Sequence, residues 1–411
     1  MSLKVLKNLR GVVTPRTEGP FGKLDVIEKV AVLIENEYIR EIAPEKNIVT
    51  KYPEVEIIDG QHCWAFPGYV DSHTHPVFYK TREEEFEMRI QGKSYEEIAT
   101  AGGGIRNSVR ALRNCSFDEL VELTYKRVSN FLHYGTTTIE AKSGYGLSLE
   151  DELKSLRVLK HVSSLVPVTI IPTFLGAHEV PDEYRNKREY YIELIINEMI
   201  PAVVEEKLAV FCDVFTEKNV FSIEESERIL LAAKNYGLIP KIHADELYPL
   251  GGAELAAKLR AISADHLCMV TEKGIQAMKK AEVVPVLLPG TTFFLGKSQY
   301  APARKMIEAG LPVALATDYN PGSSFTQNMH LILSLACIKM KMLPAEALFA
   351  ATINGARAVA REKEIGSLEV GKKADIALMD VPNYRYVPYY YGMNPVKMVI
   401  KSGLVVYKKE M

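Results

Sequence analysis

The sequence lacks both a paired cysteine motif and a long apolar run. Its five cysteines form no CxxC pair and lie far apart: Cys63, Cys115, Cys212, Cys268 and Cys337. An odd, scattered set argues against a disulfide framework or a cysteine-built zinc site, and favours the reducing cytoplasm. No stretch approaches about 18 apolar residues, and the first residues lack the apolar core of a signal peptide. We therefore expect neither a membrane span nor a secreted protein.

A strong charge of either sign is also lacking. The chain has 411 residues, with 50 Lys and Arg against 52 Asp and Glu, and a formal net charge of −2. This balance argues against nucleic acid or an anionic membrane as the main partner. The composition, 47% hydrophobic and 25% charged, is that of a globular protein. The length suits one large domain with a smaller accessory domain.

The two ends of the chain differ in apolar pattern from the middle. Residues 1–65 alternate short apolar and polar runs between turn residues, which predicts a small β module. The tail, 361–411, alternates in the same way within 366–381 and 396–408. The simplest arrangement joins both ends in one sheet system. The middle, 66–360, is predicted to form a separate domain.

In the middle segment, apolar runs alternate with helical patterns. Two of these patterns, 116–135 and 222–237, open with Ser followed three residues later by an acidic residue and end at Gly, as capped helices do. Eight runs are predicted to be strands: 66–73, 135–142, 168–175, 209–216, 238–244, 261–267, 283–289 and 312–318. Eight parallel strands covered by helices, over roughly 250 residues, are typical of a (β/α)8 barrel. A doubly wound sheet is the alternative, but no GxGxxG follows a predicted strand.

Histidines gather at the ends of the predicted strands, where a (β/α)8 barrel carries its chemistry. Five of the nine histidines lie there: His73, His75, His178, His243 and His266. Because side chains alternate along a strand, His73 and His75 point the same way and can converge on one ion. A third histidine and a carboxylate from other strands would complete a site suited to zinc or iron(II).

Each of these residues also has an ordinary explanation when it is taken alone. An isolated HxH motif is mostly incidental, His178 suits a hydrogen-bonded core histidine, and Asp318 suits a helix N-cap. Incidental histidines would be scattered evenly, whereas only four of the nine lie away from predicted strand ends. The coincidence therefore favours a metal centre.

The motifs together resemble the amidohydrolase superfamily and, within it, the imidazolonepropionase family. HTH after an apolar strand, then HAD, ADH and a late TD, is the superfamily pattern, whereas GGGI, KSGYGL, LLPG and TDYNPG belong to the narrower family. The stretches that carry the resemblance are 67–78, 82–89, 94–105, 136–147, 174–181, 241–247, 263–267, 286–295, 316–324 and 366–376. The resemblance implies an α/β fold with a (β/α)8 TIM barrel over 66–360, and a small β-sandwich formed by 1–65 and 361–411.

The resemblance further implies a metal-dependent hydrolase with a small-molecule substrate. The reaction would be the ring opening of 4-imidazolone-5-propanoate to N-formimidoyl-L-glutamate, in histidine degradation, by a cytoplasmic homodimer with one divalent ion, zinc or iron. The implied metal ligands are His73, His75, His243 and Asp318. The implied substrate contacts are Arg82, Tyr145, His178, Glu246, Asn320, Gly322 and Ser323, and the implied catalytic residues are Glu246, His266 and Asp318.

A mechanistic hypothesis assigns roles to four of these side chains. Asp318 could accept a proton from a metal-activated water, and His266 could stabilise the developing oxyanion. Glu246 could relay a proton to the leaving nitrogen, although its strand parity is opposite to that of His243. Arg82 could bind the propionate bidentately, or else pair on the surface with the acidic neighbours at 83–85.

Three alternatives remain open at the level of sequence. Another cyclic-amide hydrolase or a deaminase of the superfamily would act on a hydantoin, a dihydropyrimidine or a purine. A catalytically inactive barrel would serve as a binding subunit, but it would have lost ligand positions that this sequence retains. A second ion would need a bridging residue at the end of the fourth strand, where many relatives carry a carboxylated lysine and this chain offers Glu217.

Overall fold

The computed structural model describes residues 2–16, 18–19, 21–93, 97 and 103–410. The motif stretch 94–105 therefore lies outside the described residues, except for 97 and 103–105. In the described part of the chain, no helix combines the length and the apolar character needed to cross a membrane.

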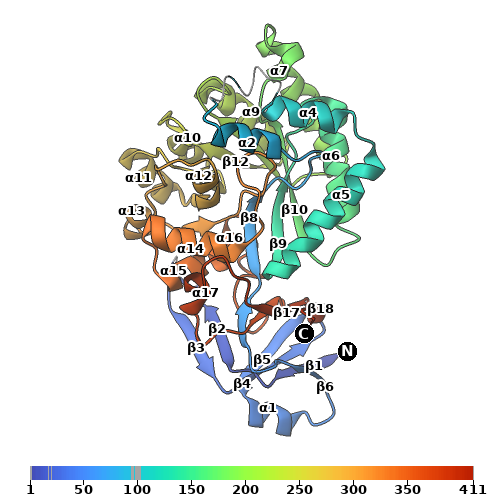
Figure 1. Ribbon diagram of the computed structural model, residues 1–411, viewed down its shortest axis with the longest axis vertical. Helices are drawn as coiled ribbons and strands as arrows, with labels where there is room; N and C mark the ends of the chain where they lie inside the picture. The colour runs from blue at the N-terminus through green and yellow to red at the C-terminus, as the bar shows by residue number, and fades with distance from the viewer. Residues whose placement is uncertain (1, 17, 20, 94–96, 98–102, 411) are drawn as a thin grey trace.

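Eight parallel strands form the centre of the larger domain, and each pairs with the next strand along the chain (Figure 1). They are β8 (Tyr69–Thr74), β9 (Thr136–Lys142), β10 (Thr169–Ala177), β11 (Phe211–Thr216), β12 (Ile239–Ala244), β13 (Ser263–His266), β14 (Val284–Leu287) and β15 (Ala314–Leu315). All eight predicted strands are confirmed. The (β/α)8 prediction is confirmed too, and the doubly wound alternative is wrong.

The ring of strands closes between the first and the last strand. Thr74, at the end of β8, forms a parallel bridge with Tyr319, just beyond β15. The Asp318 amide donates to the carbonyl oxygen of His73 at 3.1 Å. Because β15 is only two residues long, these contacts beyond its end complete the barrel. They bring the polar residues of the first and last strands together.

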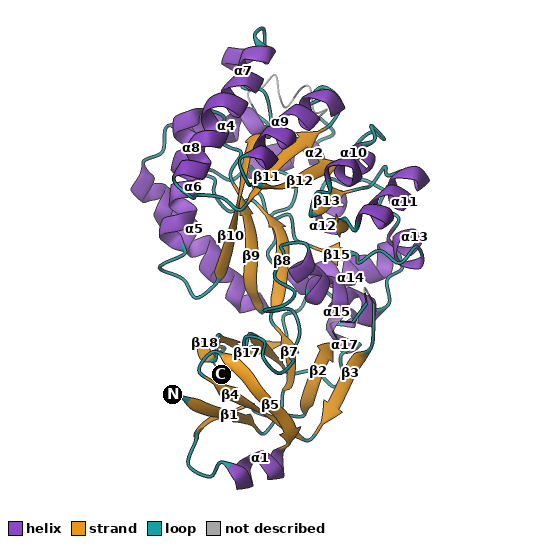
Figure 2. Cartoon of the chain, turned by 180° about the vertical axis from the view of Figure 1, so that it is seen from behind, coloured by secondary structure: helices purple, strands orange, loops and turns teal. Residues whose placement is uncertain are grey.

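Helices surround the strands on the outside (Figure 2). They are α2 (Glu83–Ile90), α4 (Ile105–Arg113), α5 (Phe117–Asn130), α6 (Leu149–Val162), α7 (Arg188–Leu194), α8 (Ile200–Glu205), α9 (Ile223–Asn235), α10 (Gly252–Leu259), α11 (Glu272–Ala281), α12 (Pro289–Phe294), α13 (Ala303–Glu308), α14 (Met329–Met340), α15 (Pro344–Ala351) and α16 (Ile353–Arg357). The two predicted capped helices are α5 and α9. Ser116 with Glu119, and Ser222 with Glu225, form the reciprocal hydrogen bonds of a capping box.

Both ends of the chain build the smaller β module (Figure 2). One sheet has the order β5-β4-β1-β6 and the other β18-β17-β16-β7-β2-β3. The strands are β1 (Leu3–Lys7), β2 (Gly11–Pro15), β3 (Leu24–Glu28), β4 (Val30–Glu35), β5 (Tyr38–Pro44), β6 (Glu56–Asp59), β7 (Trp64–Pro67), β16 (Ile376–Met379), β17 (Val396–Lys401) and β18 (Leu404–Lys408). Antiparallel pairing of β7 with β16 places Pro67 opposite Ile376. The predicted joining of the two ends is thus confirmed, whereas the domain boundaries at 65/66 and 360/361 stay a prediction.

The chain passes from the β module into the barrel through a single residue, Gly68. It separates β7 from β8, and a Cβ at this position would lie 2.4 Å from the side chain of Thr137 on β9. Glycine is therefore required by the close approach of the first two barrel strands. The short connection fixes β8, which carries His73 and His75, relative to the β module.

Candidate active site

The four predicted metal ligands come together at the C-terminal ends of the strands. His73 and His75 stand on and just after β8, His243 stands on β12, and Asp318 follows β15. The Nε2 atoms of His73 and His75 lie 3.2 Å apart, and each lies about 3.5 Å from Asp318 Oδ1 (3.6 and 3.5 Å). The ring of His243 lies 4.6 Å from that of His73, between centroids. We call these four residues the metal side of the site.

The hydrogen bond that His73 makes through Nδ1 leaves its Nε2 atom available to bind a cation. His73 Nδ1 donates to Asp265 Oδ2 at 2.6 Å, so its Nε2 carries a free lone pair when the ring is neutral. Burial lowers the pKa of both His73 and His75 well below the usual range, which favours neutral rings. Two imidazole lone pairs and a carboxylate thus face one another away from water. A divalent ion such as zinc or iron(II) fits this donor set.

Two buried carboxylates that were given no role from the sequence support the histidines. Asp265 holds His73, and its other oxygen accepts from Ser263 Oγ at 2.6 Å. Asp213 Oδ2 lies 3.0 Å from His243 Nδ1, although the two groups are not aligned as a hydrogen bond. Burial opposes protonation of His243, but Asp213 raises its pKa overall. Metal-binding histidines are commonly oriented by such carboxylates. In the sequence, Asp213 and Asp265 could have been found as charged residues inside otherwise apolar strands.

Asp71 lies two residues before His73 in the sequence DSHTH (71–75), and its carboxylate is turned away from the metal side. Its Oδ1 accepts from the amide of Thr317 at 3.0 Å, and its Oδ2 accepts from the hydroxyl of the same residue at 2.6 Å. Burial raises the pKa of Asp71 to about 7. Asp71 therefore ties β8 to the segment after β15 rather than binding the ion.

The backbone at Asp318 is left-handed, with φ 51°. Non-glycine residues rarely adopt this conformation, and where they do it is often at functional sites. The carboxylate is anchored by Thr291, on α12, whose hydroxyl donates to Asp318 Oδ2 at 2.5 Å. Oδ1 is left facing the histidines. Burial is the main cause of a raised pKa at Asp318.

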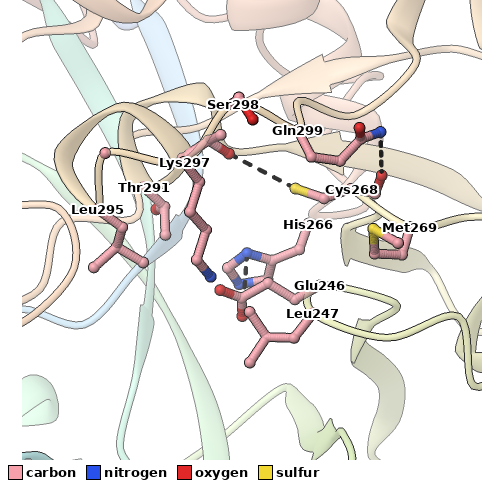
Figure 3. A pocket seen from close by; sticks show the side chains of 12 residues that line it. Glu246, Leu247, His266, Cys268, Met269, Thr291, Leu295, Lys297, Ser298 and Gln299 are labelled. Atoms are coloured by element: carbon pink, nitrogen blue, oxygen red, sulfur yellow. Dashed lines mark hydrogen bonds and ion pairs between the residues drawn. The ribbon is translucent and has the colours of Figure 1, made fainter. Parts of the chain in front are cut away.

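Glu246 reaches the same site because its strand has already ended. β12 stops at Ala244, and Asp245 has φ 49°, so the alternation of the strand no longer applies to Glu246. Glu246 Oε2 lies 3.6 Å from His266 Nδ1. Both side chains line a cavity of about 350 Å³. Figure 3 shows the amine of Lys297 pointing toward them. The parity conflict is thereby resolved, and a carboxylate–imidazole pair lies beside the metal side.

Arg82 directly precedes α2, and its side chain packs against the loop that follows β15. Its Nε and Nη2 donate to Glu85 Oε2 at 2.8 and 2.6 Å, so it pairs with one of the acidic neighbours, as the surface alternative predicted. Yet Glu85 is buried, and a Cβ on Gly322 would lie 2.2 Å from Arg82 Nη1. Glu85 also accepts from the Gly104 amide at 3.0 Å, which gives the glycine-rich motif a partner. Arg82 is therefore held against the predicted substrate loop rather than out in solvent.

Asn320 gives the substrate loop its shape. Its Oδ1 accepts from the amides of Gly322 and Ser323 at 2.8 and 2.7 Å. Arg89 was missed from the sequence: its Nη1 donates to the Gly322 carbonyl at 2.9 Å, and its guanidinium lies 5.3 Å from the ring centre of Phe294. We call Arg82, Glu85, Arg89 and the loop 320–323 the tail side of the site.

His178 and Tyr145 lie between the metal side and the tail side, and we call this pair the wall of the site. His178 stacks on His75 with 5.4 Å between ring centres, and Tyr145 lies 5.4 Å from His178. His178 Nδ1 lies 2.9 Å from the Gly144 carbonyl oxygen, which can only accept, so Nδ1 donates and Nε2 keeps a lone pair. Burial lowers the pKa of His178 to about 3. A neutral acceptor thus faces the site.

Glu217, the candidate bridge to a second ion, uses both carboxylate oxygens in hydrogen bonds to backbone amides. Its Oε2 accepts from the Leu247 amide and its Oε1 from the Lys218 amide, at 2.8 and 2.7 Å. Among the described residues, two groups are close enough to hold a metal, and Glu217 belongs to neither: His73, His75 and Asp318 form one, and His73, His243 and His266 the other.

Metal-competent histidines and an aspartate at the strand ends of a parallel (β/α)8 barrel define a metal-dependent hydrolase. The chain belongs to the amidohydrolase family, whose sequence profile matches residues 64–406. It is 49% identical over 412 residues to the imidazolonepropionase of Clostridium tetani, covering 98% of each chain. It is 54% identical over 347 residues to the imidazolonepropionase of Thermoanaerobacter pseudethanolicus, covering 84% of this chain and 83% of that protein.

Among solved structures, guanine deaminase of E. coli shares the fold. The TM-score is 0.75 and the alignment covers 100% of both chains, at 15% sequence identity. At this identity the likeness concerns the fold alone.

Proposed function

We propose that this protein has imidazolonepropionase activity: it opens the ring of 4-imidazolone-5-propanoate by hydrolysis and releases N-formimidoyl-L-glutamate. The observation that carries the proposal is the identity of 49% to a curated imidazolonepropionase over 98% of both chains. Another cyclic amidohydrolase or a deaminase is not favoured, because the relatives that are 49% and 54% identical over most of the chain are imidazolonepropionases. An inactive barrel is not favoured either, because all four ligand positions are retained.

The reaction sets three chemical requirements. Water adds to the ring carbonyl carbon, the bond from that carbon to the ring nitrogen breaks, and the nitrogen takes up a proton while a new carboxylate forms. A divalent ion held by His73, His75, His243 and Asp318 would supply a water of lowered pKa and polarise the carbonyl. The remaining requirements, proton transfer and orientation, fall to the side chains around it.

Two carboxylates are suited to moving the protons. Asp318 is fixed by Thr291 through Oδ2, so Oδ1 is the atom that can accept a proton from the attacking water. Glu246 and His266 line the cavity in Figure 3. With the substrate ring in this cavity, Glu246 would pass a proton to the leaving nitrogen, and His266 would donate to the developing oxyanion.

Substrate orientation is assigned to the tail side and the wall. The propionate carries the substrate's negative charge, and Arg82 presents Nη1 toward the substrate loop, where it can bind a carboxylate. Asn320, Gly322 and Ser323 shape that loop. Tyr145 can donate to the tail, and His178 Nε2 can accept a ring N–H.

The proposal includes one ion, zinc or iron. The engagement of both Glu217 oxygens by backbone amides supports a single ion. Assembly into a homodimer and a cytoplasmic location stay predictions. The five cysteines, all free thiols, support a reducing location.

The experiment that tests the proposed function is an assay of purified protein with 4-imidazolone-5-propanoate. The same sample is analysed for metal, and hydantoin, dihydrouracil and guanine are assayed in parallel. We expect rapid loss of imidazolonepropionate, N-formimidoyl-L-glutamate as the product, and one zinc or iron per chain. Turnover of guanine or hydantoin, with imidazolonepropionate unchanged, would refute the proposal.

A further inference from the structure

A cluster of buried charges lies in the barrel interior beneath the metal side. Lys142 on β9 is fully buried, as are the three acidic residues around it. Its Nζ donates to Glu140 Oε1 at 2.7 Å and to Asp213 Oδ2 at 2.8 Å, and it lies 3.8 Å from Asp265 Oδ2. A buried ammonium held by carboxylates is costly to desolvate, so it is a weak device for stability alone.

The same carboxylate oxygens contact the histidines of the metal side. Asp213 Oδ2, which accepts from Lys142, is the atom 3.0 Å from His243 Nδ1. Asp265 Oδ2, the atom nearest to Lys142, accepts from His73 Nδ1 at 2.6 Å. The Lys142 ammonium therefore lies next to both carboxylates. Each carboxylate in turn contacts one histidine, and the two histidines come from opposite parts of the barrel, β8 and β12.

We propose that Lys142 is a positioning residue for the metal centre, acting through Asp213 and Asp265. Its charge fixes where the two carboxylate oxygens lie. Asp265 Oδ2 then accepts from His73 Nδ1, and Asp213 Oδ2 lies against His243 Nδ1, which leaves the Nε2 atom of each ring for the ion. Without the Lys142 ammonium, the repulsion among the carboxylates of Glu140, Asp213 and Asp265 would be less fully balanced, and they would turn away from one another. The inference rests on the proposed metal site.

Lys241 on β12 provides a matched control. It is as buried as Lys142 and also lies 3.8 Å from Asp265 Oδ2. However, its Nζ donates to Ser263 Oγ at 2.7 Å and to the Ala358 carbonyl at 3.3 Å, and Ser263 Oγ in turn donates to Asp265 Oδ1 at 2.6 Å. Lys241 therefore reaches the carboxylate behind His73, whereas Lys142 contacts the carboxylates behind both His73 and His243. Loss of either lysine removes a buried charge, but only Lys142 bridges the two supporting carboxylates.

The test compares Zn²⁺ affinity, by competition with a chromogenic chelator, in wild type, K142M and K241M. We expect K142M to bind Zn²⁺ about 10- to 100-fold more weakly, the usual effect of losing a group that supports metal ligands. K241M should stay within about threefold of wild type. In the Co²⁺-substituted proteins, the visible absorption band should change in K142M and not in K241M. A folded K142M with wild-type affinity and spectrum overturns the proposal, as do equal losses in both variants.

Two further measurements keep the outcomes distinct. If K142M does not fold, D213N tests the same link with a side chain of the same shape, and unchanged Zn²⁺ affinity in folded D213N overturns the proposal. H73A serves as the reference for loss of a ligand. If wild type and H73A bind Zn²⁺ equally, the proposed metal site itself fails, whereas a difference between them with no effect of K142M sinks only the role of Lys142.

Discussion

The metal side and the tail side of the site are built in different ways. The metal side stands on strands or directly after them, and buried carboxylates hold its histidines. The tail side stands on a helix start and a loop, and is held by backbone amides and an arginine–glutamate pair. An ion requires ligands fixed within a few tenths of an ångström, so strands suit it, whereas a flexible propionate needs only a cation within reach. Substitutions on the metal side should therefore lower metal content and kcat, whereas substitutions on the tail side should raise KM.

The largest effect is expected on the metal side. His73→Ala removes a proposed ligand and leaves Asp265 without its imidazole partner, so we expect loss of bound metal and a fall in kcat of about 1,000-fold or more. Metal analysis and steady-state kinetics measure both. His161→Ala, at an exposed position on α6, is the control and should match wild type. Full metal content and activity in His73→Ala would remove this residue from the centre.

The next largest effect is expected at the carboxylate between the two sides. Glu246→Gln keeps the shape of the side chain but cannot transfer a proton, so kcat should fall about 100-fold with little change in KM. Glu254→Gln, on α10, is the control. If Glu246→Gln raised KM and left kcat alone, Glu246 would be a binding residue and not a proton carrier.

Arg82→Ala should change KM rather than kcat. Loss of a charge-assisted bond to the propionate predicts a KM raised about 10- to 100-fold, with metal content unchanged. The propionamide analogue of the substrate sharpens the test, because wild type and Arg82→Ala should process it at similar rates. If the two enzymes differed as much on the amide as on the acid, Arg82 would not recognise the tail.

The smallest effect is expected from Arg89→Ala. This side chain touches the tail side only through the Gly322 carbonyl and the ring of Phe294. A looser loop should raise KM about two- to fivefold. If Arg89 acts through the loop that Arg82 contacts, the double variant should show less than the sum of the two single effects. Full additivity would mean that the two arginines act independently.

The sequence was sufficient to locate the strands and to place the predicted ligands close together, because both depend on local patterns. Apolar runs located every barrel strand, and parity placed His73 and His75 on one face. Parity failed for Glu246, because it applies only within a strand, and the end of β12 is set by the turn at Asp245. Arg82 could not be assigned to solvent or pocket, because that choice depends on Gly322, 240 positions away.

Supporting residues were harder to predict than ligands. Asp213, Asp265 and Lys142 occupy strand interiors, where sequence patterns indicate burial but not which charge meets which. Their partners come from neighbouring strands, so only the register of the closed barrel brings them together. Asp71 illustrates the converse: by strand alternation it shares a face with the two predicted ligands His73 and His75, yet its carboxylate is engaged by Thr317.

The closure of the barrel between β8 and β15 has a consequence for how the chain reaches its working state. His73 and Asp318 are 245 positions apart (318 − 73), and they meet only across this seam. During synthesis, a chain that ends before Asp318 would present two unpaired strand edges, a form prone to wrong association. The β module is completed later still, because β7 pairs with β16. Metal uptake should therefore be a late event, marking chains whose first and last barrel strands have already joined.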